Sequence, residues 1–132
     1  MEIKRNEATL NRPEGDRVLD ASYVFADLMT FVDQLKDEKA WKKNDRNGIT
    51  VFKTDVLTIV VTILKEGAKI ENNQSGDFIT IQMLKGKARV ITPDGDTVIK
   101  KNMLVTFHPH VNHSVEALKN SIFLITTHKQ SG

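Results

Sequence analysis

The chain has 132 residues, of which 39% are hydrophobic, so it is long enough for one domain with a substantial core. Its formal net charge is +2 and its charges are spread along the chain, which argues against a nucleic-acid partner and against a membrane-binding face. Because the sequence has no cysteine, a disulfide framework, a thiol nucleophile and a thiolate metal site are excluded.

The cellular compartment is suggested by what the sequence does not contain. The segment Met1–Asp16 is polar and lacks the apolar core of a signal peptide. The longest apolar run, Val56–Leu64, is too short to span a bilayer and is interrupted by threonines. We therefore expect a cytoplasmic protein, and the absence of cysteine is consistent with a reducing compartment.

Residues 1–48 differ in pattern from the rest of the chain. They are expected to form an arm, a short strand and a helix that pack on a barrel formed by residues 49–132, all within one domain. We expect Met1–Asp16 to be either a loose arm or an edge strand that pairs with a partner subunit. Val18–Phe25 has enough apolar residues for the short strand.

A single short helix is predicted over Asp27–Trp41, where apolar residues recur at helical spacing. Its N-terminus is expected to be capped by Asp27, or by Thr30 together with Asp33. Trp41 is expected to pack on the barrel wall. The apolar positions that define the helix are Leu28, Phe31, Val32 and Leu35.

From Ile49 onward, short strand-like segments alternate with turn residues, which predicts a sandwich or a barrel. The strongest turn signal is Pro93-Asp94-Gly95, which combines a fixed backbone angle with residues that accept unusual ones. The predicted strands outside the central stretch are Ile49–Lys53, Val56–Leu64, Thr97–Ile99, Met103–Phe107, His113–Leu118 and Ser121–Thr127.

The stretch Gly67–Gly86 carries the clearest pattern in the chain. Its second half alternates strictly, so that neighbouring side chains face opposite sides, which predicts a strand. Gly86 ends this strand and the alternation resumes after it, which predicts a hairpin with a tight turn at Lys85-Gly86. The apolar side chains that share one face of the strand are Ile79, Ile81 and Met83.

The spacing of this stretch resembles the first motif of the cupin superfamily, in which two glycines enclose three metal-binding residues. The two glycines of the motif correspond to Gly67 and Gly86. Its two histidines correspond to Asn73 and Ser75, and its glutamate corresponds to Ile79. The frame is therefore similar, whereas the ligand positions hold an amide, a hydroxyl and an alkyl group.

The second half of the chain resembles the second cupin motif. Lys101-Asn102-Met103 occupies the position of the family's Gly-Asp turn, and Asn102 suits it because Asn accepts left-handed backbone geometry. Leu104–Phe107 is the strand that follows, and His113 falls on the motif's histidine. The resemblance spans Ile49–Thr127. It implies an all-β, double-stranded β-helix or jelly-roll barrel of the RmlC-like type with one short N-terminal helix, commonly paired as a homodimer.

In a cupin barrel, inward side chains of the central strands line a pocket. A mostly apolar pocket with a few polar groups is typical of a small-molecule site. The alternative is that these side chains simply fill the barrel core. The residues that the resemblance assigns to the pocket are Asn73, Ser75, Ile79, Ile81, Met83 and His113.

His113 is the one residue that matches a metal ligand of the family. Zinc and non-haem iron need three or four protein ligands, so one imidazole predicts neither a metal nor another cofactor. An alternative set is His108, His110 and His113. Pro109 makes that turn rigid and no carboxylate accompanies it, which is more typical of surface histidines.

Acid–base catalysis would need His113 together with a positioned carboxylate. Glu71 and Asp77 flank the pocket entrance in the sequence, whereas Glu116 should face away from the His113 side. Three functions therefore follow from the sequence. They are a metal-free cupin that binds a small molecule or serves as an accessory module, a divergent cupin oxygenase, isomerase or epimerase that uses His113, and a dimeric scaffold with a filled barrel.

Overall fold

The computed structural model describes residues 2–73 and 75–130, and the side chains of all of these except Asn72 and Asn73. Strands dominate, and the helices lie near the N-terminus. The elements are β1 (Lys4–Asn6), β2 (Arg17–Asp20), α1 (Leu28–Asp37), α2 (Lys39–Lys43), β3 (Arg46–Lys53), β4 (Leu57–Leu64), β5 (Lys69–Asn73), β6 (Phe78–Lys85), β7 (Lys87–Thr92), β8 (Gly95–Lys100), β9 (Leu104–Phe107), β10 (His113–Ala117) and β11 (Ser121–His128).

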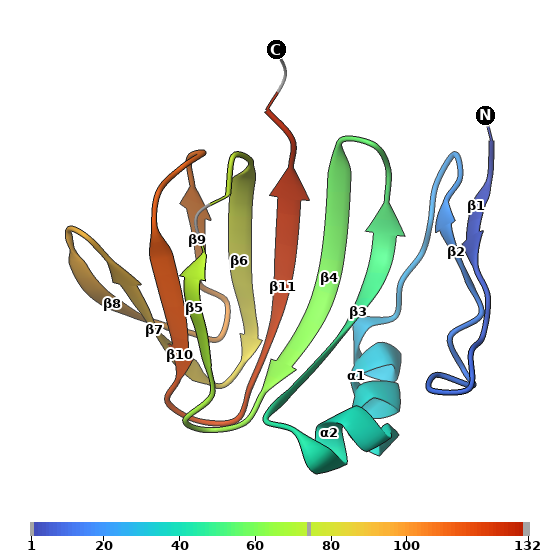
Figure 1. Ribbon diagram of the computed structural model, residues 1–132, viewed down its shortest axis with the longest axis horizontal. Helices are drawn as coiled ribbons and strands as arrows, with labels where there is room; N and C mark the ends of the chain where they lie inside the picture. Colours follow the sequence, from blue (N-terminus) through green and yellow to red (C-terminus); the bar gives the residue numbers. More distant parts are fainter. Residues whose placement is uncertain (1, 74, 131–132) are drawn as a thin grey trace.

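Two antiparallel sheets face each other and form the body of the molecule (Figure 1). One sheet has the strand order β5-β10-β7-β8, and the other has the order β3-β4-β11-β6-β9. Strands that are distant in sequence are therefore neighbours, as β4, β11 and β6 are. This rolled arrangement confirms the prediction of an all-β sandwich in which helix contributes little.

The core between the two sheets contains the inward residues of β6. Ile79, Ile81 and Met83 are 4%, 2% and 0% exposed, whereas Gln82 on the opposite face is exposed. The two-residue alternation of the sequence therefore gave the correct faces of this strand. The other fully enclosed members of this core are Leu64, Ala68, Ala88, Val90, Ile99, Phe107, Val115, Ala117 and Phe123.

A second core lies on the outer face of the β3-β4-β11 side, where α1 covers the sheet (Figure 1). Val32 and Leu35 of the helix are fully buried there against β3, β4 and β11. Trp41 packs against the same cluster, as the sequence predicted, and the Lys65 ammonium group lies 4.9 Å from the centre of its ring. The helical residues thus close a hydrophobic layer that the sheet alone would leave open.

The helical segment begins as expected, because the Asp27 side chain accepts a hydrogen bond from the Thr30 backbone N–H and caps α1. The prediction of one helix reaching Trp41 was wrong, however. Glu38 has extended backbone angles (φ −76°, ψ 150°), which end α1 and separate it from α2. The Glu38 carboxylate also forms a partly buried ion pair with Arg12, which the periodicity of the helix could not predict.

The region before α1 also differs from the prediction. The strand expected over Val18–Phe25 is shorter, since β2 ends at Asp20, and it pairs with β1 of the polar arm. The arm thus pairs within its own chain, next to β3 (Figure 1). Tyr23 and Phe25 lie outside the strand with 76% and 89% of their surface exposed.

The predicted turns are confirmed by their backbone angles. Gly86 has φ +96°, and a Cβ atom there would come within 2.5 Å of the Asn120 carbonyl oxygen, so only glycine fits. Asn102 has φ +71°, which is the left-handed geometry expected of it.

Across residues 2–73 and 75–130, no helix has the length and apolar character needed to cross a membrane.

Candidate ligand-binding site

His113 begins β10 and is buried, with 3% of its surface exposed. Its ring stacks on that of Phe107, the last residue of β9, with the ring centres 3.9 Å apart and the planes at 2°. Phe107 is itself a member of the core between the sheets. The family-matched histidine therefore lies at the end of the barrel core and is fixed there by an aromatic partner.

The two ring nitrogens of His113 differ in their surroundings. Nδ1 lies 3.1 Å from the carbonyl oxygen of Val111. Because a carbonyl oxygen can only accept, Nδ1 must carry the proton of this hydrogen bond, and the neutral ring then presents Nε2 as an acceptor. Nε2 is buried and has no hydrogen-bond partner among the residues that the structure describes.

A buried nitrogen without a partner is unusual, because polar atoms taken from water normally find one. Leaving such an atom unpaired costs about 1–3 kcal/mol. The core of this barrel therefore holds an acceptor at a cost to stability.

Two turns meet beside this histidine. The His110 backbone N–H donates to the Ser75 carbonyl oxygen over 2.6 Å, and the Asp77 N–H donates to Ser75 Oγ over 3.0 Å. The Phe78 and His108 rings lie 5.2 Å apart. The connection before β6 is thus held against the connection between β9 and β10, at one end of the barrel (Figure 1).

The residues assigned to the pocket from the sequence are only partly brought together. Asn73 and His113 are partners in the β5–β10 register, but the side chain of Asn73 lies outside the described residues. Ser75 is half-buried in the turn above the core. The inward residues of β6 are closely packed, and Met83 lies at the far end of that strand.

The described residues do not offer the set of ligands that a zinc or non-haem iron ion of a metal-binding cupin requires. Residues 2–73 and 75–130 contain no group of three His, Asp or Glu side chains able to hold an ion. The alternative set does not converge either, since His108 and His110 are exposed whereas His113 is buried. The ring of His110 instead lies over Gly76.

The carboxylates considered from the sequence do not serve the histidine. Glu116 points away from the core and its Oε1 accepts a hydrogen bond from Arg89 Nη1 over 2.9 Å, as its position in the alternation suggested. Glu71 lies 3.7 Å from the ammonium group of Lys69. Glu71 and Glu116 are thus engaged with basic partners and not with His113, whereas for Asp77 it is the backbone N–H that is engaged, with Ser75 Oγ.

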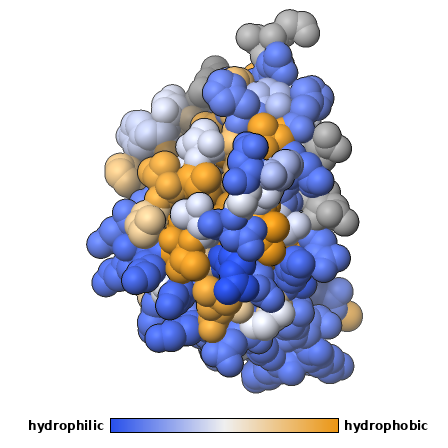
Figure 2. Space-filling model, turned by 90° about the vertical axis from the view of Figure 1, so that its left-hand side faces the viewer, coloured by the Kyte–Doolittle hydropathy of each residue, from blue (hydrophilic) through white to orange (hydrophobic). Residues whose placement is uncertain are grey.

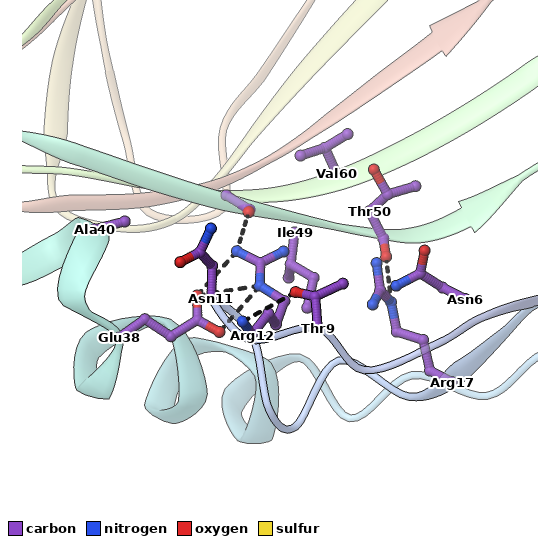
Figure 3. Close-up of a pocket in the computed structure, with 11 residues that line it drawn as sticks. Asn6, Thr9, Asn11, Arg12, Arg17, Glu38, Ala40, Ile49, Thr50 and Val60 are labelled. Atoms are coloured by element: carbon purple, nitrogen blue, oxygen red, sulfur yellow. Dashed lines mark hydrogen bonds and ion pairs between the residues drawn. The ribbon is translucent and has the colours of Figure 1, made fainter.

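Away from His113, a polar hollow of about 580 Å³ lies where the N-terminal arm meets α2 and β3 (Figure 3). The Arg12 guanidinium group donates to both oxygens of the Glu38 carboxylate, from Nε at 3.2 and 3.0 Å and from Nη2 at 2.9 Å, and also to the Gly48 carbonyl oxygen at 2.9 Å. Arg17 donates to the Thr50 carbonyl oxygen at 2.7 Å. These arginines are therefore occupied in holding the arm on the barrel.

Glu38 is the centre of that network. Burial alone would raise the pKa of its carboxyl group, but hydrogen bonds from Arg12, Asn47 and Gln34, together with the Arg12 charge, hold the pKa below its ordinary value of 4.5. Asn47 also donates to the Leu35 carbonyl oxygen at the end of α1. The network joins the arm, the helix end and β3, and its polar groups satisfy one another.

Sequence reasoning missed Phe107 as a site residue. A signal was present, because alternation in Leu104–Phe107 places Val105 and Phe107 on one face, and the structure buries both against the core. It also missed the network around Glu38. Arg12 lies 26 positions before Glu38 in the chain, so no local sequence pattern indicates that the two side chains meet.

Comparison with known proteins agrees with this architecture. A conserved protein of unknown function from Streptococcus pyogenes superposes with a TM-score of 0.67 at 17% identity, covering 86% of this chain and 93% of that one. A cupin superfamily protein from Desulfitobacterium hafniense gives 0.68 at 12% identity, covering 85% and 95%. An RmlC-like cupin from Shewanella frigidimarina gives 0.62 at 15% identity, covering 65% and 78%. The chain has the cupin fold.

The likeness is one of shape rather than of sequence. No protein-family model and no curated protein sequence matches the chain. At identities of 12–17%, a shared cupin fold carries no activity with it, since one fold hosts many functions. Within the cupin fold of this chain, His113 is the residue at which a buried polar atom lacks a partner among the described residues.

Proposed function

We propose that this cupin is a metal-free binding protein for a small molecule that donates a hydrogen bond to Nε2 of His113. The observation that carries the proposal is the buried Nε2 of His113, which has no hydrogen-bond partner among the described residues. A ligand with an N–H or O–H group would satisfy it, and an apolar body would suit the Phe107 ring and the aliphatic core beside it.

The ligand-free barrel is closed around the site, since His113 and Phe107 are only 3% and 6% exposed. Binding therefore requires the turns at that end to move apart. Among the described residues, the His110–Ser75 hydrogen bond and the Phe78–His108 ring contact join these turns, and both lie near the surface. Local opening of such a segment needs less free energy than opening of the core.

Two matched probes test this proposal. Phenol and anisole have similar rings, but only phenol can donate a hydrogen bond. We expect phenol to bind at least about fivefold more tightly than anisole, which corresponds to roughly 1 kcal/mol for one hydrogen bond. The measurement is the shift of the Ile79 methyl resonances during each titration. Ile79 is the cross-strand partner of Phe107, whose ring stacks on His113.

The control is His113→Phe, which keeps an aromatic ring and removes the acceptor. In this variant the preference for phenol should disappear. Equal binding of the two probes by the unmodified protein, or no binding of either, would refute the proposal. One equivalent of firmly held iron, manganese, nickel or zinc in the purified protein would also refute it, because Nε2 would then have a partner.

A scaffold with a filled barrel is the second candidate, and the close packing of Ile79, Ile81 and Met83 favours it. In this case neither probe would enter, and the function would lie in association with another copy of the chain. A homodimer is the association that the cupin resemblance suggests, and the mass in solution measures it. An enzyme that uses His113 has less support, because Glu71 and Glu116 are paired with Lys69 and Arg89.

A further inference from the structure

A hollow of about 490 Å³ lies at the end of the barrel opposite His113, where the turns that follow β6 and β10 come together (Figure 1). It is unrelated to the proposed site in both position and chemistry. Its charged lining consists of Lys85, Lys87, Lys100, Lys101 and Lys119. Gly86 and Asn120 complete the wall.

The topology of the sheets forces these lysines together. Lys85 and Lys87 stand on either side of Gly86, which is the residue that makes the tight turn. Lys87 is the direct cross-strand partner of Lys100 in the β7–β8 register. The backbone N–H of Lys119 lies 3.3 Å from the Lys87 carbonyl oxygen, which brings the β10–β11 turn to the same place.

The charges of this lysine hollow are not compensated by the part of the chain that the structure describes. None of the ion pairs among the described residues involves a lysine of the hollow. The described lysines whose ammonium groups have a polar or charged partner are Lys65 and Lys69, which lie outside the hollow. Glu66 is near, since its backbone N–H donates to Asn120 Oδ1 over 2.8 Å, but it does not line the hollow. Like charges that lie directly opposite each other on neighbouring strands destabilise a sheet. Lys87 and Lys100 form such a pair.

We propose that the lysine hollow binds a small anion that carries several phosphate groups. Five lysines that line one concave site match the closely spaced negative charges of such an anion, and each ammonium group supplies up to three donors. The close approach of Gly86 to the backbone of Asn120 and Ser121 is what brings the β6–β7 turn and the β10–β11 turn to one wall of the hollow.

The shape of this end favours a small anion over an extended polyanion. Duplex nucleic acid or an anionic membrane requires a basic surface that extends beyond one hollow. Here the face seen in Figure 2 has apolar residues along its middle and a largely hydrophilic lower end, and the net charge of the whole chain is only +2. The five lysines thus line a single hollow and do not form part of an extended basic surface that the net charge would support.

Inorganic tripolyphosphate is the probe that tests this proposal. Titration calorimetry should show saturable binding, and the melting temperature should rise more than in sodium chloride of the same ionic strength. The variant Lys100→Gln/Lys101→Gln should bind at least about tenfold more weakly. Both side chains are exposed, so the variant should fold. It should also melt slightly above the unmodified protein when no anion is present, because repulsion has been removed.

The control variant is Lys42→Gln/Lys43→Gln, which makes the same change in net charge on the exposed end of α2. It should bind tripolyphosphate as the unmodified protein does. An equal loss in both variants would show non-specific attraction and overturn the proposal. So would an effect no larger than that of chloride, or binding confined to duplex DNA or to vesicles of anionic lipid.

Discussion

At the scale of single residues, His113 is an exception to the way the rest of the core is built. Its neighbours in the barrel are apolar, whereas it brings a polar ring whose Nε2 has no partner within the described residues. Stacking on Phe107 and the hydrogen bond to Val111 hold the ring in place. The ring is therefore positioned as firmly as a structural residue, yet one of its nitrogens contributes nothing to stability.

Replacing His113 by Phe should stabilise the protein. The change relieves an unpaired buried acceptor, worth about 1–3 kcal/mol, and loses the hydrogen bond from Nδ1, worth about 0.5–1.5 kcal/mol. We expect the free energy of unfolding to rise by about 1 kcal/mol, as measured by urea denaturation. His113→Ala is the matched control, because it removes the ring as well and should lower that free energy by about 2–4 kcal/mol. A clear loss of stability in His113→Phe would mean that Nε2 is already satisfied.

Residue types alone predicted part of this site. The sequence placed His113 at the start of a strand, as the structure does. The alternation along that strand predicted that Glu116 points away from His113. The unpaired state of Nε2 could not be predicted, because it depends on which atoms reach the ring from β9 and the turn before it. Phe107 stacks on His113 across a connection whose path no local pattern specifies.

At the scale of elements, the sequence predicted β6 well and the helical segment only in part, since α1 was predicted correctly and its end was not. In β6 each side chain's surroundings follow from a period of two, and the glycine that ends the strand is forced by its geometry. In the helical segment, apolar spacing gave α1 correctly, but the break at Glu38 depends on contacts with the arm. Local patterns predict elements where local forces dominate, and fail where a distant partner decides.

The network around Glu38 predicts how pH affects the arm. The pKa of this carboxyl group is lowered in the folded protein, so its contribution to stability is complete above about 4.5 and is lost as the pH falls through the lowered value. Near neutral pH, Glu38→Gln should lower the free energy of unfolding by about 1–2 kcal/mol, since hydrogen bonds to a charged group are lost. Thermal melting of both proteins from pH 7 to pH 3 measures the difference.

Below the lowered pKa the two proteins should melt alike, because a protonated carboxyl group and an amide have similar shape and no charge. Glu7→Gln, which changes an exposed carboxylate of the same arm, should show no such convergence. A difference between Glu38→Gln and the unmodified protein that stays constant down to pH 3 would show that the Arg12–Glu38 pair does not hold the arm.

At the scale of the whole molecule, the cupin fold separates two ends of different chemistry. The His113 end is apolar and closed, with one buried acceptor, whereas the opposite end gathers five lysines in one hollow. The sequence suggested the barrel because glycine and strand spacing report on topology. It did not suggest the lysine hollow, because the lysines are separated along the chain and only the sheet register joins them.

The account of this protein depends on the state of one ring, and long-range ¹H–¹⁵N correlation spectra of the histidine side chains measure it directly. The account predicts that His113 in the ligand-free protein is neutral, with the proton on Nδ1 and an unprotonated Nε2 that shifts when phenol is added. A proton on Nε2, or a metal-bound nitrogen in the purified protein, would contradict it.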